Sequence, residues 1–205
     1  MLKLVPRVRK FQIPVFNFLN KATFNSGKTS ENVEITNTNI KGYQGVSIPV
    51  MVVRPKNIGP SAPCLLYCHG GGFFFEAISP HRKAVIDYAI GAGCVIVFPH
   101  YRVSWGNSFP TSLEDCYETL MWTGKQAKEL GINPDNIAIA GESAGGCLAA
   151  CVAQMAQDRK SVKINFQMLV YPVADHTMSS QSMKDFYDTP LWNTPNSKLM
   201  WDVYL

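Results

Sequence analysis

The sequence predicts an α/β protein whose sheet is mostly parallel. Three short apolar runs, residues 63–68, 94–101 and 136–140, have the length and continuity of strands covered on both faces. A segment with the helical spacing of apolar residues follows each run. Strands that alternate with helices at short intervals form parallel sheets through right-handed crossovers. We therefore expect a three-layer αβα arrangement.

The other expected elements surround these three units. Residues 32–37 and 45–54 alternate between apolar and polar side chains, which predicts an antiparallel hairpin at a sheet edge. The predicted segments after it are helices over 81–92, 110–131 and 144–157, a turn at 133–135 and a strand over 164–173. No strand pattern follows residue 173, so the sheet is expected to end there on an uncovered edge.

Composition indicates one globular domain with accessory segments. The chain has 205 residues, of which 46% are hydrophobic and 17% charged, enough for one sizeable core. The net charge is +4 and the basic residues form no stripe, so no nucleic-acid partner is expected. We expect an N-terminal cap segment over residues 1–30, a partial core over 31–173 and a second cap region over 174–205.

The first 30 residues are basic and contain no Asp or Glu. Gln12, Pro14 and Asn17 interrupt every apolar run, which argues against a secretory signal. The favoured interpretation is a basic amphipathic segment that packs over the domain. A transit peptide and a membrane-contacting surface are the alternatives.

The cysteines are expected to be free thiols. They lie in apolar strand-like or helix-like runs, and none forms a C-x-x-C pair or a zinc-type grouping with histidine. This pattern predicts a reducing cytoplasm and neither a metal nor a cofactor. The six are Cys64, Cys68, Cys94, Cys116, Cys147 and Cys151.

Residues 141–146, Gly-Glu-Ser-Ala-Gly-Gly, lie where a predicted strand passes into a helix. A serine hydroxyl is a weak nucleophile and needs exposure, a base and donors for the developing oxyanion. Glycines two positions on either side of Ser143 remove Cβ atoms that would collide in a sharp turn. Ser143 is therefore the candidate nucleophile, and the alternative is a tight turn with an incidental serine.

A second glycine-rich segment, His-Gly-Gly-Gly-Phe at 69–73, follows an earlier core strand. We expect the N–H groups of Gly71 and Gly72 to join that of Ala144 in an oxyanion hole. A flexible loop or a phosphate loop is the alternative, but no Gly-Lys-Ser/Thr follows. Residues 73–75, all Phe, are expected to give the loop an apolar wall that suits an ester.

Together these motifs resemble the hormone-sensitive-lipase-like branch of the α/β-hydrolases, which comprises carboxylesterases and lipases. The resemblance covers about residues 45–205 and implies acyl transfer from an ester to water. It implies that Ser143 is the nucleophile, that Gly71, Gly72 and Ala144 form the oxyanion hole, and that the N-terminal segment belongs to a cap. The matching segments are 69–73, Tyr101-Arg102, Phe109-Pro110, 113–115, 141–146 and 171–173.

The chain departs from the family pattern at three places. His100 replaces the usual acidic residue, Ser-Trp-Gly occupies 104–106, and Glu142 stands where Asp is more frequent. These departures bear on substrate preference more than on the chemistry.

The expected base is missing from the sequence. In this fold the order is Ser, then Asp or Glu, then His, on loops after further strands. Only His176 follows Ser143, and it comes too early; Asp175, Asp185 and Asp188 fall in the cap region. We expect a fragment of a longer esterase with much reduced turnover. The alternative is a non-catalytic relative that binds small molecules, and ester and amide substrates are not distinguished.

Overall fold

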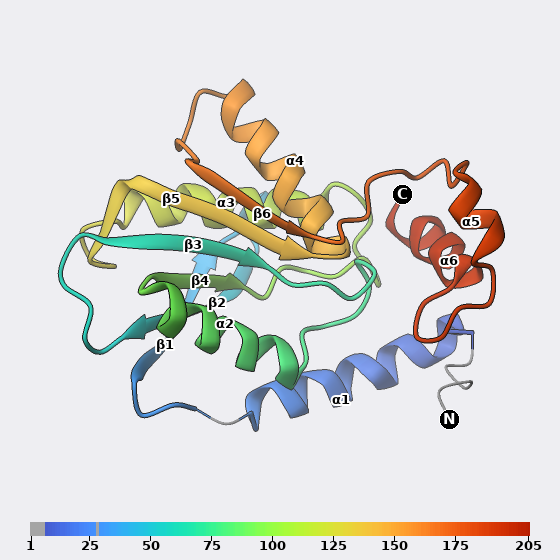
Figure 1. Ribbon diagram of the computed structural model, residues 1–205, viewed down its shortest axis with the longest axis horizontal. Coiled ribbons are helices and arrows are strands. Elements are labelled where there is room, and N and C mark those ends of the chain that lie inside the picture. Colours follow the sequence, from blue (N-terminus) through green and yellow to red (C-terminus); the bar gives the residue numbers. More distant parts are fainter. Residues whose placement is uncertain (1–6, 28) are drawn as a thin grey trace.

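The computed structural model describes residues 7–27 and 29–205, which form a six-stranded sheet between helices (Figure 1). The strand order is β1-β2-β4-β3-β5-β6. β1 and β2 form the predicted antiparallel hairpin at the edge, β2 is antiparallel to β4, and the other three pairs are parallel. The strands are β1 (Val33–Lys41), β2 (Ser47–Pro55), β3 (Ala62–Cys68), β4 (Val95–Pro99), β5 (Ile132–Glu142) and β6 (Phe166–Val170).

Helices cover both faces of the sheet, as predicted. α2 (Ser79–Ala92) packs on one face, and α3 (Thr111–Lys125) and α4 (Ala144–Asp158) pack on the other. The alternation of side chains along β3 produces the two layers, because Leu65 belongs to the cluster of α2 and Leu66 to the cluster of α3 and α4. The three-layer αβα prediction is confirmed.

Three predicted boundaries were wrong. Residues 133–135 lie within β5, where pairing with β3 shifts from Ala62 opposite Ile132 to Cys64 opposite Ile137. The predicted turn is present as a bulge, which the Asn133 side chain stabilises by accepting the Asp135 N–H at 2.9 Å. α3 ends at Lys125 and is followed by turns up to residue 131, and β6 covers only 166–170 of the predicted 164–173.

Two segments far apart in the sequence meet beside the carboxyl ends of the strands, and we call residues 7–27 and 174–205 the cap segments (Figure 1). They contain η1 (Lys10–Gln12), α1 (Ile13–Asn25), α5 (Gln181–Asp185) and α6 (Thr194–Tyr204). The Val8 N–H donates to the Asn196 side chain at 3.0 Å and so joins the two. The expected domain limits at residues 30 and 173 remain predictions.

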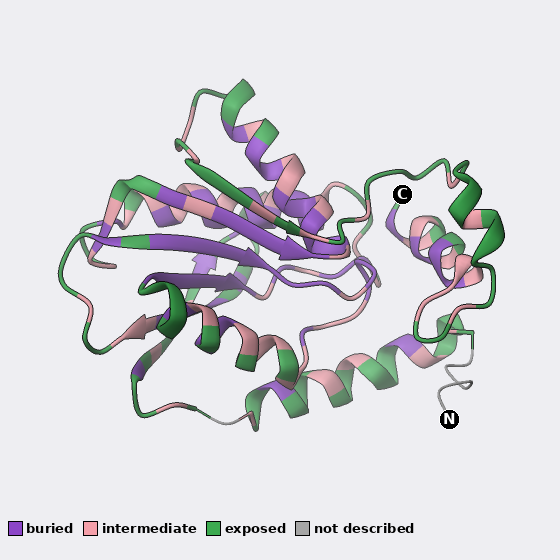
Figure 2. Cartoon of the chain, viewed as in Figure 1, coloured by how far each residue is buried: buried purple, intermediate pink, exposed green. Residues whose placement is uncertain are grey.

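Burial and the cysteines agree with this architecture. The central strands are buried, whereas most of β6, an edge strand as expected, is exposed (Figure 2). All six cysteines are free, four of them buried. Within residues 7–27 and 29–205, no helix has the length and apolar character to span a bilayer, and no cluster of His, Cys, Asp and Glu could hold a metal ion.

Candidate active site

Ser143 lies at the sharp turn between β5 and α4. Its φ of 54° and ψ of −122° form a conformation that a residue with a side chain adopts only where its surroundings impose it. The Ser143 N–H donates to the Val170 carbonyl of β6 at 2.9 Å, and the Ser143 carbonyl accepts the Cys147 and Val173 N–H groups at 3.2 and 3.1 Å. The side chain is half-buried. The turn is thus fixed on both sides while the hydroxyl stays at the surface of the core.

Two glycines make this turn sterically feasible. A Cβ on Gly141 would lie 2.2 Å from the Gly145 carbonyl oxygen, and a Cβ on Gly145 would lie 2.1 Å from the Cys68 carbonyl oxygen. No side chain can be accommodated at such distances, because the opposing atoms belong to backbone that packing holds in place. The glycines expected from the sequence are therefore required by the backbone packing of β3 against the start of α4.

The glycine loop lies against the Ser143 turn. β3 and β5 are parallel neighbours with Cys68 opposite Gly141, so their carboxyl ends bring the two motifs together. Gly71 and Gly72 have φ values of 120° and 58°, and this backbone path favours glycine. A Cβ on Gly71 would also lie 2.8 Å from the Phe75 carbonyl oxygen.

Three backbone donors remain available at this place. Among residues 7–27 and 29–205, none accepts a hydrogen bond from the N–H of Gly71, Gly72 or Ala144. Ala144 is the first residue of α4, so its N–H lies at the positive end of the helix dipole. The structure thus gathers Ser143 and the three expected oxyanion donors at the ends of β3 and β5. Their catalytic roles remain predictions.

Glu142 connects the two loops to α2. Its Oε1 accepts the Gly70 N–H at 2.6 Å and lies 3.0 Å from His81 Nε2. His81 Nδ1 accepts the Ile78 N–H at 2.9 Å, which assigns the proton to Nε2. Burial by itself raises the pKa of Glu142, but hydrogen bonds from His81 and Gly70 outweigh it and lower the pKa. Glu142 is therefore ionised, and its carboxylate holds the glycine loop in place through the Gly70 N–H.

His69 supports the glycine loop from within the core. It is completely buried, its Nδ1 lies 2.6 Å from the Gly70 carbonyl oxygen, and its ring stacks on Tyr101 with centroids 4.3 Å apart. The Tyr101 hydroxyl donates to the His69 carbonyl at 2.7 Å. Burial, and then the proximity of His81, lowers the pKa of His69 to about 3. A neutral imidazole that donates to the loop carbonyl supports the backbone of the glycine loop.

The other histidines are engaged away from the serine. His81 binds Glu142, His100 packs edge-on against Phe24 with centroids 4.8 Å apart, and His176 is exposed. In the part of the chain that the structure describes, no side chain is hydrogen-bonded to the Ser143 hydroxyl. The exclusion of His176 as a base remains a prediction from the sequence.

The expected apolar wall of residues 73–75 was wrong for two of its three members. Phe73 and Phe74 are completely buried, and Phe73 stacks on Tyr204 of α6 with centroids 3.9 Å apart. The positive φ of Phe73, 61°, turns the chain at this point into the core. These rings anchor α6 to the loop, and only Phe75 lines the neighbouring cavity.

A cavity of about 420 Å³ lies between the glycine loop and the cap segments. No local sequence pattern indicates the cap residues that line it, because their approach to the loop depends on how the two cap segments pack. The lining is largely apolar and comprises Val8, Gln12, Phe16, Asn20, Gly71, Phe75, Glu76, Ile78, His81, Leu191 and Trp192.

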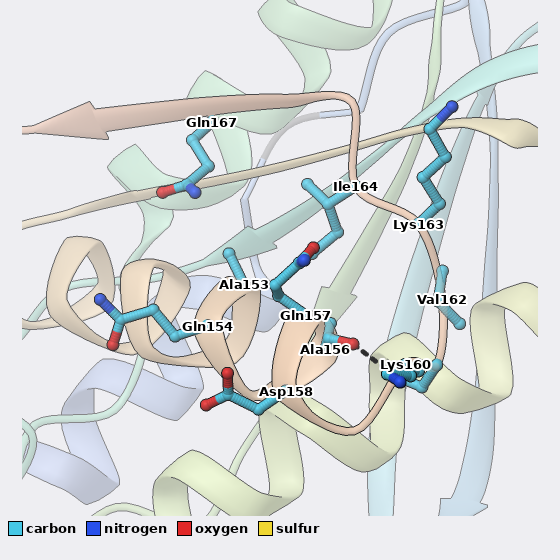
Figure 3. A pocket seen from close by; sticks show the side chains of 11 residues that line it. Ala153, Gln154, Ala156, Gln157, Asp158, Lys160, Val162, Lys163, Ile164 and Gln167 are labelled. Carbon is cyan, nitrogen blue, oxygen red and sulfur yellow. Dashed lines mark hydrogen bonds between the residues drawn. The ribbon is translucent and has the colours of Figure 1, made fainter.

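A larger depression of about 800 Å³ lies between the end of α4 and the start of β6 (Figure 3). Its lining includes Gln154, Gln157 and Asp158. It is at the opposite end of β6 from Val170, which binds the Ser143 N–H. Of the four candidate site residues, Gly71 lines the smaller cavity, whereas Ser143, Gly72 and Ala144 are not part of its lining. We therefore take the smaller cavity as the candidate substrate pocket next to the site.

Comparison with known proteins supports the same fold. Residues 65–205 match the family described as alpha/beta hydrolase fold. Carboxylesterase NlhH of Mycobacterium tuberculosis is 35% identical over 151 residues, which are 73% of this chain and 47% of that protein. The ethyl acetate hydrolase of Pseudomonas putida is 30% identical over 164 residues, 78% of this chain and 52% of that protein.

Solved structures agree over nearly the whole chain. A bacterial heroin esterase superposes with a TM-score of 0.86 at 34% identity, covering 98% of this chain and 64% of that one. A thermostable esterase from Pseudomonas putida superposes with a TM-score of 0.85 at 29% identity, covering 97% and 63%. The chain spans about half the length of the curated relatives it matches.

Fold, motifs and relatives define the class: the chain belongs to the α/β-hydrolase family. Within that family, the esterases that it matches are members of the hormone-sensitive-lipase-like branch, and the resemblance noted in the sequence is confirmed.

Proposed function

We propose that this chain is a serine hydrolase acting on carboxylic esters, with Ser143 as its nucleophile. The observation that carries the proposal is the φ of 54° at Ser143, at a strand–helix junction that lies against a glycine loop. Such backbone strain at a half-buried serine in a strand–helix turn is typical of a nucleophile.

The proposed reaction follows from the placement of the donors. The Ser143 oxygen adds to the acyl carbon, and the carbonyl oxygen becomes an anion that accepts hydrogen bonds from the N–H groups of Gly71, Gly72 and Ala144. Collapse of this intermediate releases the alcohol, and water then releases the acid.

The serine proton needs a base, and no described histidine is hydrogen-bonded to Ser143. We therefore infer slow turnover for the 205-residue chain by itself, with residual catalysis from the oxyanion hole.

Small, apolar esters fit the site best. The cavity of about 420 Å³ has Phe75, Leu191 and Trp192 in its lining, which suits a short acyl or aromatic group. An ethyl acetate hydrolase and carboxylesterases are among the relatives. The free thiols favour a reducing compartment such as the cytoplasm.

A fluorophosphonate probe and p-nitrophenyl acetate test the proposal. Added imidazole replaces the missing base. Because imidazole also hydrolyses p-nitrophenyl acetate by itself, the rate with Ser143→Ala is measured as the background. We expect labelling and imidazole-stimulated turnover in the unmodified chain and in Ser179→Ala, an exposed-serine control, and neither in Ser143→Ala. Equal rates in all three variants would contradict the proposal, and absent labelling would favour a binding protein without catalysis. A p-nitroanilide substrate separates amide from ester hydrolysis.

A further inference from the structure

The outward face of α1 is apolar. Phe11 of η1 and Val15, Phe18 and Leu19 of α1 have exposed fractions of 70, 61, 74 and 50%. Their spacing of four, seven and eight residues from Phe11 places them on one side of a helix. Figure 2 shows α1 mostly in the colour of exposed residues, with intermediate and buried residues between them. Single exposed apolar residues are ordinary, but a continuous row of them indicates an interaction surface.

The inward face of α1 combines two buried apolar residues, Ile13 and Phe24, with two asparagines that bond to backbone groups of the glycine loop and the segment after it. Asn17 donates to the Phe74 carbonyl at 2.9 Å and accepts the Glu76 N–H at 3.0 Å. Asn20 donates to the Glu76 carbonyl at 3.3 Å. These hydrogen bonds hold α1 against the glycine loop and help to fix its rotation about the helix axis. The apolar row therefore faces outward, because the buried Ile13 and Phe24 and the two asparagines hold the other side of the helix against the protein.

Basic residues accompany the apolar row. Residues 1–30 contain six Lys and Arg residues and no Asp or Glu, so the other 175 residues carry 13 basic and 15 acidic residues, a formal charge of −2. Arg9 and Lys10 are exposed next to Phe11. Lys21 lies near the other end of α1, with its ammonium group 2.9 Å from Glu76. Arg9 and Lys10 thus place positive charge at the N-terminal end of the apolar row, whereas the charge of Lys21 is paired with Glu76.

We propose that the outward face of α1 docks on the surface of an anionic phospholipid bilayer, with the helix parallel to the membrane plane. The rings of Phe11 and Phe18 would enter the boundary between headgroups and acyl chains, while Arg9 and Lys10 contact lipid phosphates. Gln12 and Phe16 of the same segment line the cavity beside Gly71. Docking therefore brings that cavity close to the lipid surface, although vesicle binding itself does not depend on hydrolysis.

Charge favours a bilayer over a second copy of this chain. A two-fold interface places the same surface patch on both partners. The basic N-terminal segment of one copy would then face that of the other, and like charges across an interface are costly. An anionic membrane offers both an apolar layer and the opposite charge.

Vesicle sedimentation tests this inference with the 205-residue chain. Vesicles of phosphatidylcholine alone are compared with vesicles that contain about 30% phosphatidylglycerol, at about 0.1 and 0.5 M NaCl. We expect binding to the anionic vesicles that weakens at high salt. The double variant Phe11→Ser/Phe18→Ser should bind about tenfold more weakly. The matched control Phe166→Ser/Phe186→Ser, which removes two rings that are 62 and 60% exposed elsewhere, should bind within about twofold of the unmodified chain.

Tryptophan quenching provides a readout that does not rely on loss of binding. Brominated lipids should quench Phe18→Trp on anionic vesicles but leave Phe186→Trp unquenched. The inference is overturned if the chain does not bind anionic vesicles, or if both double variants bind equally. It is also overturned if sedimentation shows a dimer that Phe11→Ser/Phe18→Ser dissociates.

Discussion

The indole of Trp192 covers Gly72 so closely that a Cβ on Gly72 would lie 2.7 Å from its Cη2 atom. The indole N–H donates to the Ser197 hydroxyl of α6 at 2.9 Å, which fixes the ring. A residue of the C-terminal cap segment therefore sets the position of a proposed oxyanion donor. Cap and oxyanion hole are coupled through this one contact.

Gly72→Ala should impair the proposed chemistry more than the fold. The methyl group meets Trp192, and the φ of 58° is unfavourable for alanine by about 1–2 kcal/mol. Displacement of the Gly72 N–H should slow fluorophosphonate labelling of Ser143 by about 100-fold or more. Labelling rates and thermal unfolding measure the two effects.

Trp192→Phe is the control for Gly72→Ala. It removes the ring atoms nearest to Gly72 but leaves the Gly72 backbone donor in place, so labelling should change by less than about tenfold. In the double variant Gly72→Ala/Trp192→Phe, the alanine methyl group no longer collides with the indole, but the unfavourable φ at position 72 remains. Only part of the labelling rate should therefore return. Full-rate labelling in Gly72→Ala would show that its N–H is no oxyanion donor.

Gly145→Ala should prevent stable folding. Its Cβ would lie 2.1 Å from the Cys68 carbonyl oxygen and 2.4 Å from the His69 carbonyl oxygen, and these backbone atoms belong to the end of β3 and the loop after it. We expect a loss of more than about 3 kcal/mol in the free energy of unfolding. Gly91→Ala is the matched control: it lies in α2 with nothing within 4 Å of its Cβ, and should gain about 0.5 kcal/mol. Urea denaturation compares the two, and a stable Gly145→Ala would be incompatible with the described packing.

Asp115→Asn should strongly destabilise the fold through Arg102. Asp115 is completely buried and accepts from Arg102 Nε and Nη2, both at 2.8 Å, and from the Tyr43 N–H at 2.9 Å. Removing one partner of a buried ion pair leaves the other charge uncompensated and costs about 3–5 kcal/mol.

Glu114→Gln is the control for Asp115→Asn. It breaks the ion pair with the partly exposed Arg159, which should cost at most about 1 kcal/mol. If the two variants unfold at the same denaturant concentration, the ion pair between Asp115 and Arg102 does not stabilise the fold as its geometry indicates.

The site could be predicted from the sequence where local sterics determine it. Gly141 and Gly145 are dictated by contacts within one strand–helix turn and its neighbouring strand. Two apolar strands whose motifs follow at their carboxyl ends bring those motifs together in any parallel sheet. The positions of Ser143 and the glycine loop in the fold could therefore be predicted from the sequence.

The cap was not predictable in this way, because its side chains are oriented by distant packing. Phe73 and Phe74 were expected at the cavity but are buried under α6, whose position no local pattern indicates. Trp192 lies in a segment of mixed polarity with two prolines nearby, and nothing there signals its contact with Gly72. Likewise, the rotation of α1 about its axis depends in part on the Phe74 carbonyl that Asn17 binds, which is distant in the sequence.

His100→Phe should make stability less dependent on pH. Burial foremost, and then the positive charges of Lys21 and Arg82, lowers the pKa of His100 to about 4, whereas its unfolded value is about 6.5. The unfolded chain therefore binds more protons between these values, and stability is lost as the pH falls from about 6.5 through 4. This single group accounts for on the order of 3 kcal/mol.

Phenylalanine preserves the edge contact with Phe24 and removes the proton, so the pH profiles of the two proteins isolate His100. His69, with its pKa lowered to about 3, contributes to both profiles in the same direction and cancels in the difference. Urea unfolding at several pH values between about 7 and 4.5 should show the unmodified chain losing more stability than His100→Phe. Parallel profiles would mean that His100 is protonated in the folded chain, and that Lys21 and Arg82 do not act on it as their positions indicate.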